Sequence, residues 1–264
     1  MITIKNPEQI ACMRRAGALL HQVLSALARE VRPGVTTASL DRLAQAMIRD
    51  HGAVPSFLGY EGFPASVCTS VDDCVIHGIP SDRQTLREGS LLSLDCGLIL
   101  DGWQADSALT VPVGEVSSEA RQLIAVTEAA FFAGARNAVN GRTLGDIGHA
   151  VQQTAESAGY GVIRDYTGHG IGRDMHEDPA VYNFGIPGHG QRISAGMTLA
   201  IEPMIALGDW HTDEGDDGWA VRTRDGRPSA HYEHTVAVAE NGLPEILTLP
   251  GFQWKEHQHG TDTV

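Results

Sequence analysis

A single Asp-Gly pair between two apolar runs constrains the fold of this chain more than any other sequence feature. Asp101-Gly102 lies within the strand-like residues 91–113. An Asp-Gly pair in this setting is a strong signal for a two-residue hairpin turn. Such a turn places Leu100 opposite Trp103. The sequence therefore predicts a long antiparallel hairpin.

The same hairpin would bring two carboxylates close together. In this register Gly97 faces Asp106, and Asp95 lies on the same face of the ladder as Asp106. Diagonal neighbours of this kind are about 7–8 Å apart at Cα, so the two carboxylates can converge on one point. Considered alone, each aspartate is more simply a solvated strand residue or a turn cap.

The rest of the sequence predicts helices followed by strands, and this order occurs twice. Pro33-Gly34 ends the first helix, and Gly52 ends the second. The polar tail beyond Trp254 is expected to fray. Helical spacing of apolar residues covers 7–31, 39–50, 118–139 and 144–157, whereas strands are expected across 67–76, across 91–113 and, with turns, beyond 159.

The two halves share a faint register at an offset of 107 residues. Five matches are as compatible with chance as with internal duplication. A true duplication would give two similar half-units whose sheets pack together, with a site where they meet. Because no Pro/Ser-rich linker separates the halves, we expect one domain across residues 1–264. The matches are Gly34 with Gly141, Thr36 with Thr143, Leu40 with Ile147, Gln45 with Gln152, and Gly52 with Gly159.

Composition limits the classes of protein to consider. Of the 264 residues, 42% are hydrophobic and 20% charged, which is typical of a globular protein with a large core. The net charge of −14 argues against a generic nucleic-acid binder. The beginning of the sequence lacks a signal-peptide pattern, and no apolar run approaches the roughly 18 residues of a membrane helix. The four cysteines form no C-x-x-C pair. We therefore expect a cytoplasmic protein without membrane association.

Three further segments change the interpretation of the two aspartates. His169 lies between glycines in GHGIG, Glu202 ends an apolar strand as the middle residue of IEP, and Glu233 begins another strand in EHT. Burying these charges is costly unless a cation compensates them. Together with Asp95 and Asp106, they form an oxygen-rich set that suits divalent ions such as Mn, Fe or Co.

DCG-x8-D, GHGIG, IEP and EHT, in this order, resemble the five-ligand signature of the methionine aminopeptidase family. The resemblance covers roughly Lys5 to Leu249 and is strongest to the bacterial type I enzymes. It implies an α+β pita-bread fold, which is a curved antiparallel sheet with outer helices and pseudo-two-fold halves around a dimetal centre. Members of this kind are typically monomers.

Carried over position by position, the resemblance implies a role for each ligand. Asp95 would bind one metal, and His169 and Glu202 the other, while Asp106 and Glu233 would bridge both. Two ions about 3.5–4 Å apart can share a hydroxide that attacks the first peptide bond. Glu202 would also carry a proton to the leaving amine. Co, Mn, Fe and Zn all tolerate this ligand set.

The resemblance also implies residues that contact the substrate. His77 would contact the peptide nitrogen, and His176 would stabilise the tetrahedral intermediate. Phe57 and Phe63 depart from the expected pattern, and Met175 replaces the usual aromatic residue, which leaves the shape of the pocket open. The implied methionine pocket comprises Phe57, Tyr60, Phe63, Cys68, His77, Met175 and Trp219.

The implied function is removal of the initiator methionine from nascent proteins when the second residue is small, with transient contact to the ribosome possible. Three alternatives compete with it. Aminopeptidase P and prolidase share the ligands but usually carry a large N-terminal domain. A catalytically inactive pita-bread protein that binds RNA or proteins would be expected to lose ligands, and the acidic charge disfavours RNA. A conventional zinc peptidase would need H-E-x-x-H, which is absent.

Overall fold

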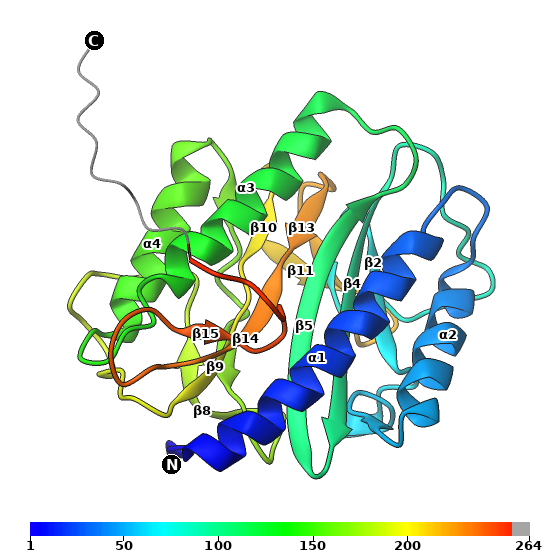
Figure 1. Cartoon of the computed structure of the whole chain (residues 1–264). Helices are drawn as coiled ribbons and strands as arrows, with labels where there is room; N and C mark the ends of the chain where they lie inside the picture. Colours follow the sequence, from blue (N-terminus) through cyan, green and yellow to red (C-terminus); the bar gives the residue numbers. More distant parts are fainter. Residues whose placement is uncertain (255–264) are drawn as a thin grey trace.

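The computed structural model describes residues 1–254, so the tail that was expected to fray lies outside the described residues. Helices lie on the outside of a curved arrangement of antiparallel strands (Figure 1). They occur in the two predicted pairs, each ahead of a set of strands. The helices are α1 (Pro7–Glu30), α2 (Thr37–Asp50), α3 (Ser118–Ala135) and α4 (Leu144–Ser157), and the short 3-10 helix η1 spans Tyr60–Gly62.

The strands of the first half are β1 (Val54–Pro55), β2 (Val67–Val71), β3 (Cys74–Ile76), β4 (Leu91–Leu100) and β5 (Trp103–Pro112). The second half begins with β6 (Gly161–Val162), β7 (Gly168–Gly170), β8 (Glu177–Val181), β9 (Thr198–Ile201) and β10 (Met204–Ala206). It continues with β11 (Thr212–Glu214), β12 (Val221–Thr223), β13 (Ser229–His231), β14 (Glu233–Ala237) and β15 (Glu245–Ile246).

The main sheet runs through both halves of the chain. Its strand order is β1-β4-β5-β14-β9-β7-β8, with β2 also paired to β4 and β15 to β14. Strand β14 joins the halves because it pairs with β5 on one side and with β9 on the other, antiparallel in both cases. Two smaller sheets, β13-β10-β6 and β11-β12-β3, complete the structure of the described residues.

The predicted hairpin is confirmed, including its register. Leu100 pairs with Trp103, and Gly97 pairs with Asp106. Asp101 and Gly102 have φ of 52° and 74°, as a type I′ turn requires at its two central positions. Since the turn has two residues, every residue of β4 has its partner in β5 fixed.

Differences from the predicted elements are small and have local causes. The expected helix end at Val139 is wrong, because α3 ends at Ala135 and the chain then tightens into short turns, with Ala138 N donating to Ala135 O. The strand expected across 67–76 is two strands, β2 and β3, separated by a turn at Asp72, whose φ is 54°. Helix α2 begins two residues earlier than expected, at Thr37.

Each pair of helices covers its own half of the sheet (Figure 1). Helix α1 lies across β4 and β5 and buries Leu20 and Leu27 against Leu94. Helix α3 buries Phe131 in a second cluster, which also contains Ile201 and the α4 residues Leu144 and Ile147. Fully burying one such side chain contributes about 1.5–3 kcal/mol. No helix within residues 1–254 is long and apolar enough to cross a membrane.

The two halves repeat the same backbone arrangement at the predicted offset. Gly34 N donates to Leu86 O at 2.9 Å, and, 107 residues later, Gly141 N donates to Ile193 O at 2.9 Å. Both glycines have the same left-handed backbone, with φ of 91° and 92°. Likewise the isolated bridge Thr36–Thr85 recurs as Thr143–Arg192. This recurrence favours internal duplication over chance and gives the pseudo-two-fold halves a structural basis.

Candidate metal centre

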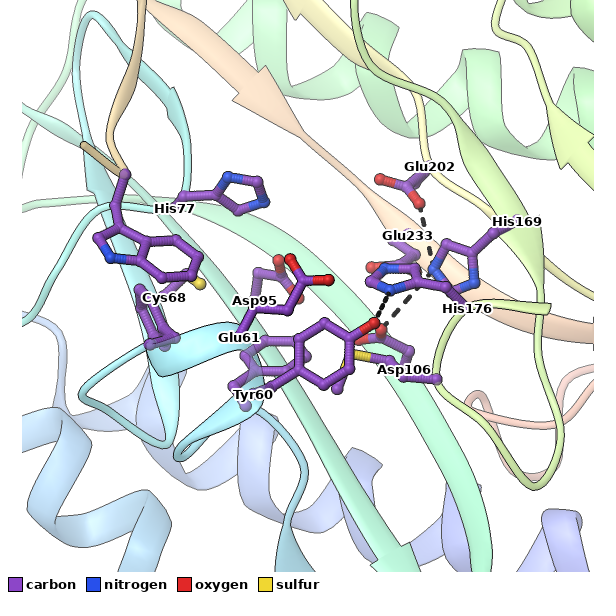
Figure 2. Close-up of a pocket in the computed structure, with 14 residues that line it drawn as sticks. Tyr60, Glu61, Cys68, His77, Asp95, Asp106, His169, His176, Glu202 and Glu233 are labelled. Carbon is purple, nitrogen blue, oxygen red and sulfur yellow. Dashed lines mark hydrogen bonds and ion pairs between the residues drawn. The ribbon is translucent and has the colours of Figure 1, made fainter. Parts of the chain in front are cut away.

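Five adjacent strands of the main sheet each bring one predicted ligand to the same place (Figure 2). Asp95 lies on β4, Asp106 on β5, Glu233 begins β14, Glu202 follows β9, and His169 is the middle residue of β7. In sheet order these are consecutive neighbours, although they lie far apart in sequence. Asp95 and Glu202 are separated by the repeat offset of 107 residues, so they occupy matching positions of the two halves.

The glycines beside His169 allow neighbouring strands to approach closely. A side chain on Gly168 would collide with the carbonyl oxygen of Ala200, and one on Gly170 with the carbonyl oxygen of Asp178. The absence of side chains lets β7 pack closely between β8 and β9. His169 is thereby held firmly at the centre of the site.

The histidine presents a lone pair to the carboxylates. Nδ1 of His169 donates to the carbonyl oxygen of Gly170 at 2.8 Å, which leaves Nε2 unprotonated in the neutral ring. Nε2 is 3.9 Å from Asp106 Oδ2 and 3.6 Å from Glu202 Oε1. Ligand atoms of Asp106, His169 and Glu233 all lie within 4.8 Å of one another. These distances suit groups arranged around a cation.

Electrostatics support the same interpretation. Burial raises the pKa of Asp95 to about 7. Burial, followed by repulsion from neighbouring carboxylates, raises the pKa of Asp106, Glu202 and Glu233 well above the ordinary values. Burial lowers the pKa of His169 to about 4, so this ring is neutral at pH 7. Without a cation, the surroundings of these carboxyl groups and of His169 therefore disfavour their charged forms.

Several oxygens of the cluster lack protein partners. Asp95 Oδ1, Asp106 Oδ1 and Glu233 Oε1 are buried and accept no hydrogen bond from residues 1–254. A buried polar atom of this kind is costly unless water or an ion satisfies it. The donor set of carboxylate oxygens and one imidazole nitrogen suits a divalent ion of the Mn, Fe, Co or Zn type. The residues therefore fit a divalent metal.

We expect the metal-free protein to become less stable as the pH rises from about 5 to 8. Because these carboxyl groups have a raised pKa in the folded state, their contribution to stability is present at low pH and is lost as the pH rises through the folded pKa, near 7 for Asp95. Bound metal removes this loss, because the cation favours the ionised carboxylates. Melting temperatures of chelated and Mn²⁺-saturated protein at both pH values test this. A gap between the two forms that stays constant with pH would contradict it.

The remaining predicted site residues line the same cavity as the five ligands. Its apolar part is one cluster in which Phe63 meets the Trp219 ring edge-on at 5.1 Å. Gly97 leaves room for this cluster, because a side chain there would lie 2.9 Å from Phe57. Phe57 and Met175 are buried core residues that also face the cavity. The predicted lining residues found there are Phe57, Tyr60, Phe63, Cys68, His77, Met175, His176 and Trp219.

The two predicted catalytic histidines lie on opposite sides of this cavity. His77 follows β3 with an unusual φ of 59°, and its ring meets Trp219 edge-on. His176 precedes β8, and its ring centroid is 4.3 Å from that of His169. Burial lowers the pKa of both His77 and His176. Both are therefore neutral rings at pH 7 that can donate one hydrogen bond.

A buried ion pair anchors the loop that carries His176. Lys5 Nζ is 2.6 Å from Glu177 Oε2, with both side chains almost fully buried. The other carboxylate oxygen of Glu177 accepts the backbone N–H of Arg173 at 2.9 Å. The N-terminal segment thus holds the loop between His169 and His176.

Sequence reasoning missed two residues of the site. Glu61 lines the cavity beside Tyr60. His231 is fully buried, its Nε2 lies 3.7 Å from Glu202 Oε2, and neither of its ring nitrogens has a protein hydrogen-bond partner. Burial lowers the pKa of His231 to about 3. The available signal was the strand spacing, since His231 precedes Glu233 by two residues.

Comparisons with known proteins identify the family. The model of metallopeptidase family M24 matches residues 11–240. Methionine aminopeptidase of Clostridium acetobutylicum is 53% identical over 94% of this chain and 99% of its own length. Methionine aminopeptidase 1 of Bacillus subtilis is 42% identical over 94% and 99% of the two chains.

Solved structures give the same result. The crystal structure of methionine aminopeptidase from Rickettsia prowazekii superposes with a TM-score of 0.92 at 43% identity, covering 94% of this chain and 100% of that one. Prolidase from Pyrococcus furiosus shares the fold at 22% identity, with a TM-score of 0.75, and is covered over 65% of its length. Since the closer similarity extends along nearly the whole sequence, this chain belongs to the methionine aminopeptidases of metallopeptidase family M24.

Proposed function

We propose that this chain, as a single catalytic domain, is a metal-dependent aminopeptidase that removes the initiator methionine when the second residue is small. The observation that carries the proposal is the position of the carboxylate cluster at one end of an apolar cavity. Peptide hydrolysis needs a polarised carbonyl beside a bound side chain, and this arrangement supplies both. Family membership implies use of a divalent metal.

We assign two ions to the cluster. Asp95 would hold one ion, His169 and Glu202 would hold the other, and Asp106 and Glu233 would contribute to both. The unpartnered oxygens of Asp95, Asp106 and Glu233 support this assignment. Bound divalent ions supply Lewis-acid polarisation of the scissile carbonyl and acidify a water molecule. The donor set does not choose between Co, Mn, Fe and Zn.

The protein side chains handle protons and developing charge. Glu202 accepts the proton of the attacking water and delivers it to the leaving amine. His176 donates to the oxygen that becomes negative in the tetrahedral intermediate. His77, across the cavity, contacts the nitrogen of the scissile peptide.

The apolar cluster supports methionine as the preferred first residue. An unbranched thioether side chain fills irregular apolar space well. Cys68 stays a neutral thiol because burial, followed by repulsion from Asp95, raises its pKa well above the usual value. Phe57, Phe63 and Met175 form the remaining apolar wall.

We also propose that the enzyme acts in the cytoplasm. All four cysteines are free thiols, which suits the reducing cytoplasm. The substrate is the N-terminal methionine of nascent polypeptides. The family resemblance supports a monomer that contacts the ribosome transiently.

We expect kcat/KM for a Met-Ala-Ser peptide to be at least about 100-fold higher than kcat/KM for Lys-Ala-Ser. Burying an unpaired ammonium in the apolar cavity costs several kcal/mol, and each 1.4 kcal/mol is a factor of ten. Peptide assays with Mn²⁺ measure the ratio. A norleucine peptide, which keeps shape and polarity, serves as the control and should be cleaved within about tenfold of methionine, because its transfer free energy is similar. The proposal would be contradicted by equal turnover of the lysine and methionine peptides. It would also be contradicted by cleavage of Ala-Pro peptides instead of Met-Ala-Ser.

A further inference from the structure

Tyr60 and His176 meet across the cavity from opposite halves of the chain. Tyr60 begins η1 in the first half, whereas His176 lies just ahead of β8 in the second. The Tyr60 hydroxyl oxygen is 2.7 Å from Nδ1 of His176 (Figure 2). This separation is typical of a good hydrogen bond.

The state of the imidazole depends on which of the two groups donates. A neutral imidazole carries hydrogen on only one nitrogen, and the partner of one nitrogen decides the state of the other. Burial, followed by repulsion from Glu61 and Asp174, raises the pKa of Tyr60, so the hydroxyl keeps its proton. When this hydroxyl donates to Nδ1, the ring hydrogen of His176 is on Nε2.

We propose that Tyr60 is a positioning residue that holds His176 as its Nε2–H tautomer, in the ring orientation that donates to the developing oxyanion. This inference rests on the proposed function, in which His176 stabilises the tetrahedral intermediate. Tyr60 then has two roles. Its ring lines the apolar cavity, and its hydroxyl orients the group that acts on the carbonyl beside that cavity.

Both ends of the hydrogen bond are anchored. On the first side, Gly59 N donates to Phe63 O at 2.8 Å, and Gly59 has the left-handed φ of 86° that the turn requires. On the other side, the residue after the imidazole is Glu177, which is buried in its ion pair with Lys5. Because both backbones are already fixed, the hydrogen bond orders few additional groups. It can therefore keep the imidazole in one orientation.

The first test is Tyr60→Phe, which removes the hydroxyl and keeps the ring. We expect kcat on Met-Ala-Ser to fall about 3- to 10-fold, the scale of one net hydrogen bond. KM should stay within about twofold, because phenylalanine preserves the wall of the cavity. Tyr182→Phe, which removes a hydroxyl from a half-exposed ring outside this cavity, is the matched control and should leave kcat unchanged. An unchanged kcat in Tyr60→Phe, or a rise in KM alone, would overturn the proposal.

A double-mutant cycle separates positioning from a general structural role. If Tyr60 acts through His176, adding Tyr60→Phe to His176→Ala should cause no further loss of kcat. An equal loss in both backgrounds would mean that Tyr60 acts independently of the histidine. The proposal would then be wrong even though the single substitution lowers kcat.

The tautomer can be measured without any substrate. In Zn²⁺-loaded protein labelled with ¹⁵N-histidine, long-range ¹H–¹⁵N spectra distinguish the two neutral forms, and the His176→Ala spectrum identifies the signals. We expect the Nε2–H form for His176, with the Nδ1 shift changed in Tyr60→Phe. A hydrogen on Nδ1 in the parent would overturn the inference. If the Nε2–H form is found but Met-Ala-Ser is not cleaved, the proposed function fails while the assigned tautomer stands.

Discussion

Asp106→Asn is expected to lose tight metal binding and at least about 1000-fold in kcat/KM. Asp106 is the buried carboxylate that we place between two cations, and one of its oxygens has no protein partner. An amide offers one neutral acceptor oxygen where the site needs a charged group with two. Loss of an electrostatic group at the reaction centre typically costs 10²–10³ in rate, and loss of the ions adds to it. Metal analysis after equilibration with Mn²⁺, together with peptide assays, measures both effects.

The same substitution should not destabilise the metal-free protein and is expected to stabilise it. Burial and neighbouring carboxylates raise the pKa of Asp106, so this group opposes folding at neutral pH unless a cation compensates it. We therefore expect chelated Asp106→Asn to melt at or above the temperature of the chelated parent. Asp101→Asn makes the same change at the exposed turn of the same hairpin and should keep both metal and activity. Full metal content and full activity in Asp106→Asn would refute our assignment.

The hairpin could be predicted in detail because its determinants are local. A two-residue turn at Asp101-Gly102 fixes the register of both strands, so the position of Asp106 relative to Asp95 followed from sequence alone. The starts of α1, α3 and α4 were equally accessible, whereas α2 begins two residues earlier than predicted. In α1, Asn6 and Gln9 form a capping box that fixes the first turn.

The convergence of the other ligands could not be predicted from periodicity. Strand β14 lies between β5 and β9, and this order places Glu233 between the two halves. Sheet order depends on long-range packing, to which no local spacing is sensitive. The family resemblance supplied that information. His231 had no motif and was therefore missed, although it lies only two residues ahead of Glu233, at the end of β13.

His176→Ala and His77→Ala are expected to keep both metal ions and to lose about 100-fold in kcat. We assign neither ring to the metal ligands, and Nδ1 of His176 is already hydrogen-bonded to the Tyr60 hydroxyl. Their proposed work is to donate hydrogen bonds to the reacting peptide, and loss of one such group typically costs 10²–10³ in rate. Metal analysis and steady-state kinetics on Met-Ala-Ser, compared with the parent, provide the measurement.

The two kinds of variant differ in how metal content and rate are related. Metal content and rate should fall together in Asp106→Asn, because the carboxylate is required for the ions that the reaction uses. In the histidine variants the rate should fall alone. KM should change little in His176→Ala, because an interaction made mainly in the transition state contributes to kcat and not to ground-state binding. Loss of metal in His176→Ala, with metal and rate retained in Asp106→Asn, would reverse the roles assigned here and would place the histidine among the ligands.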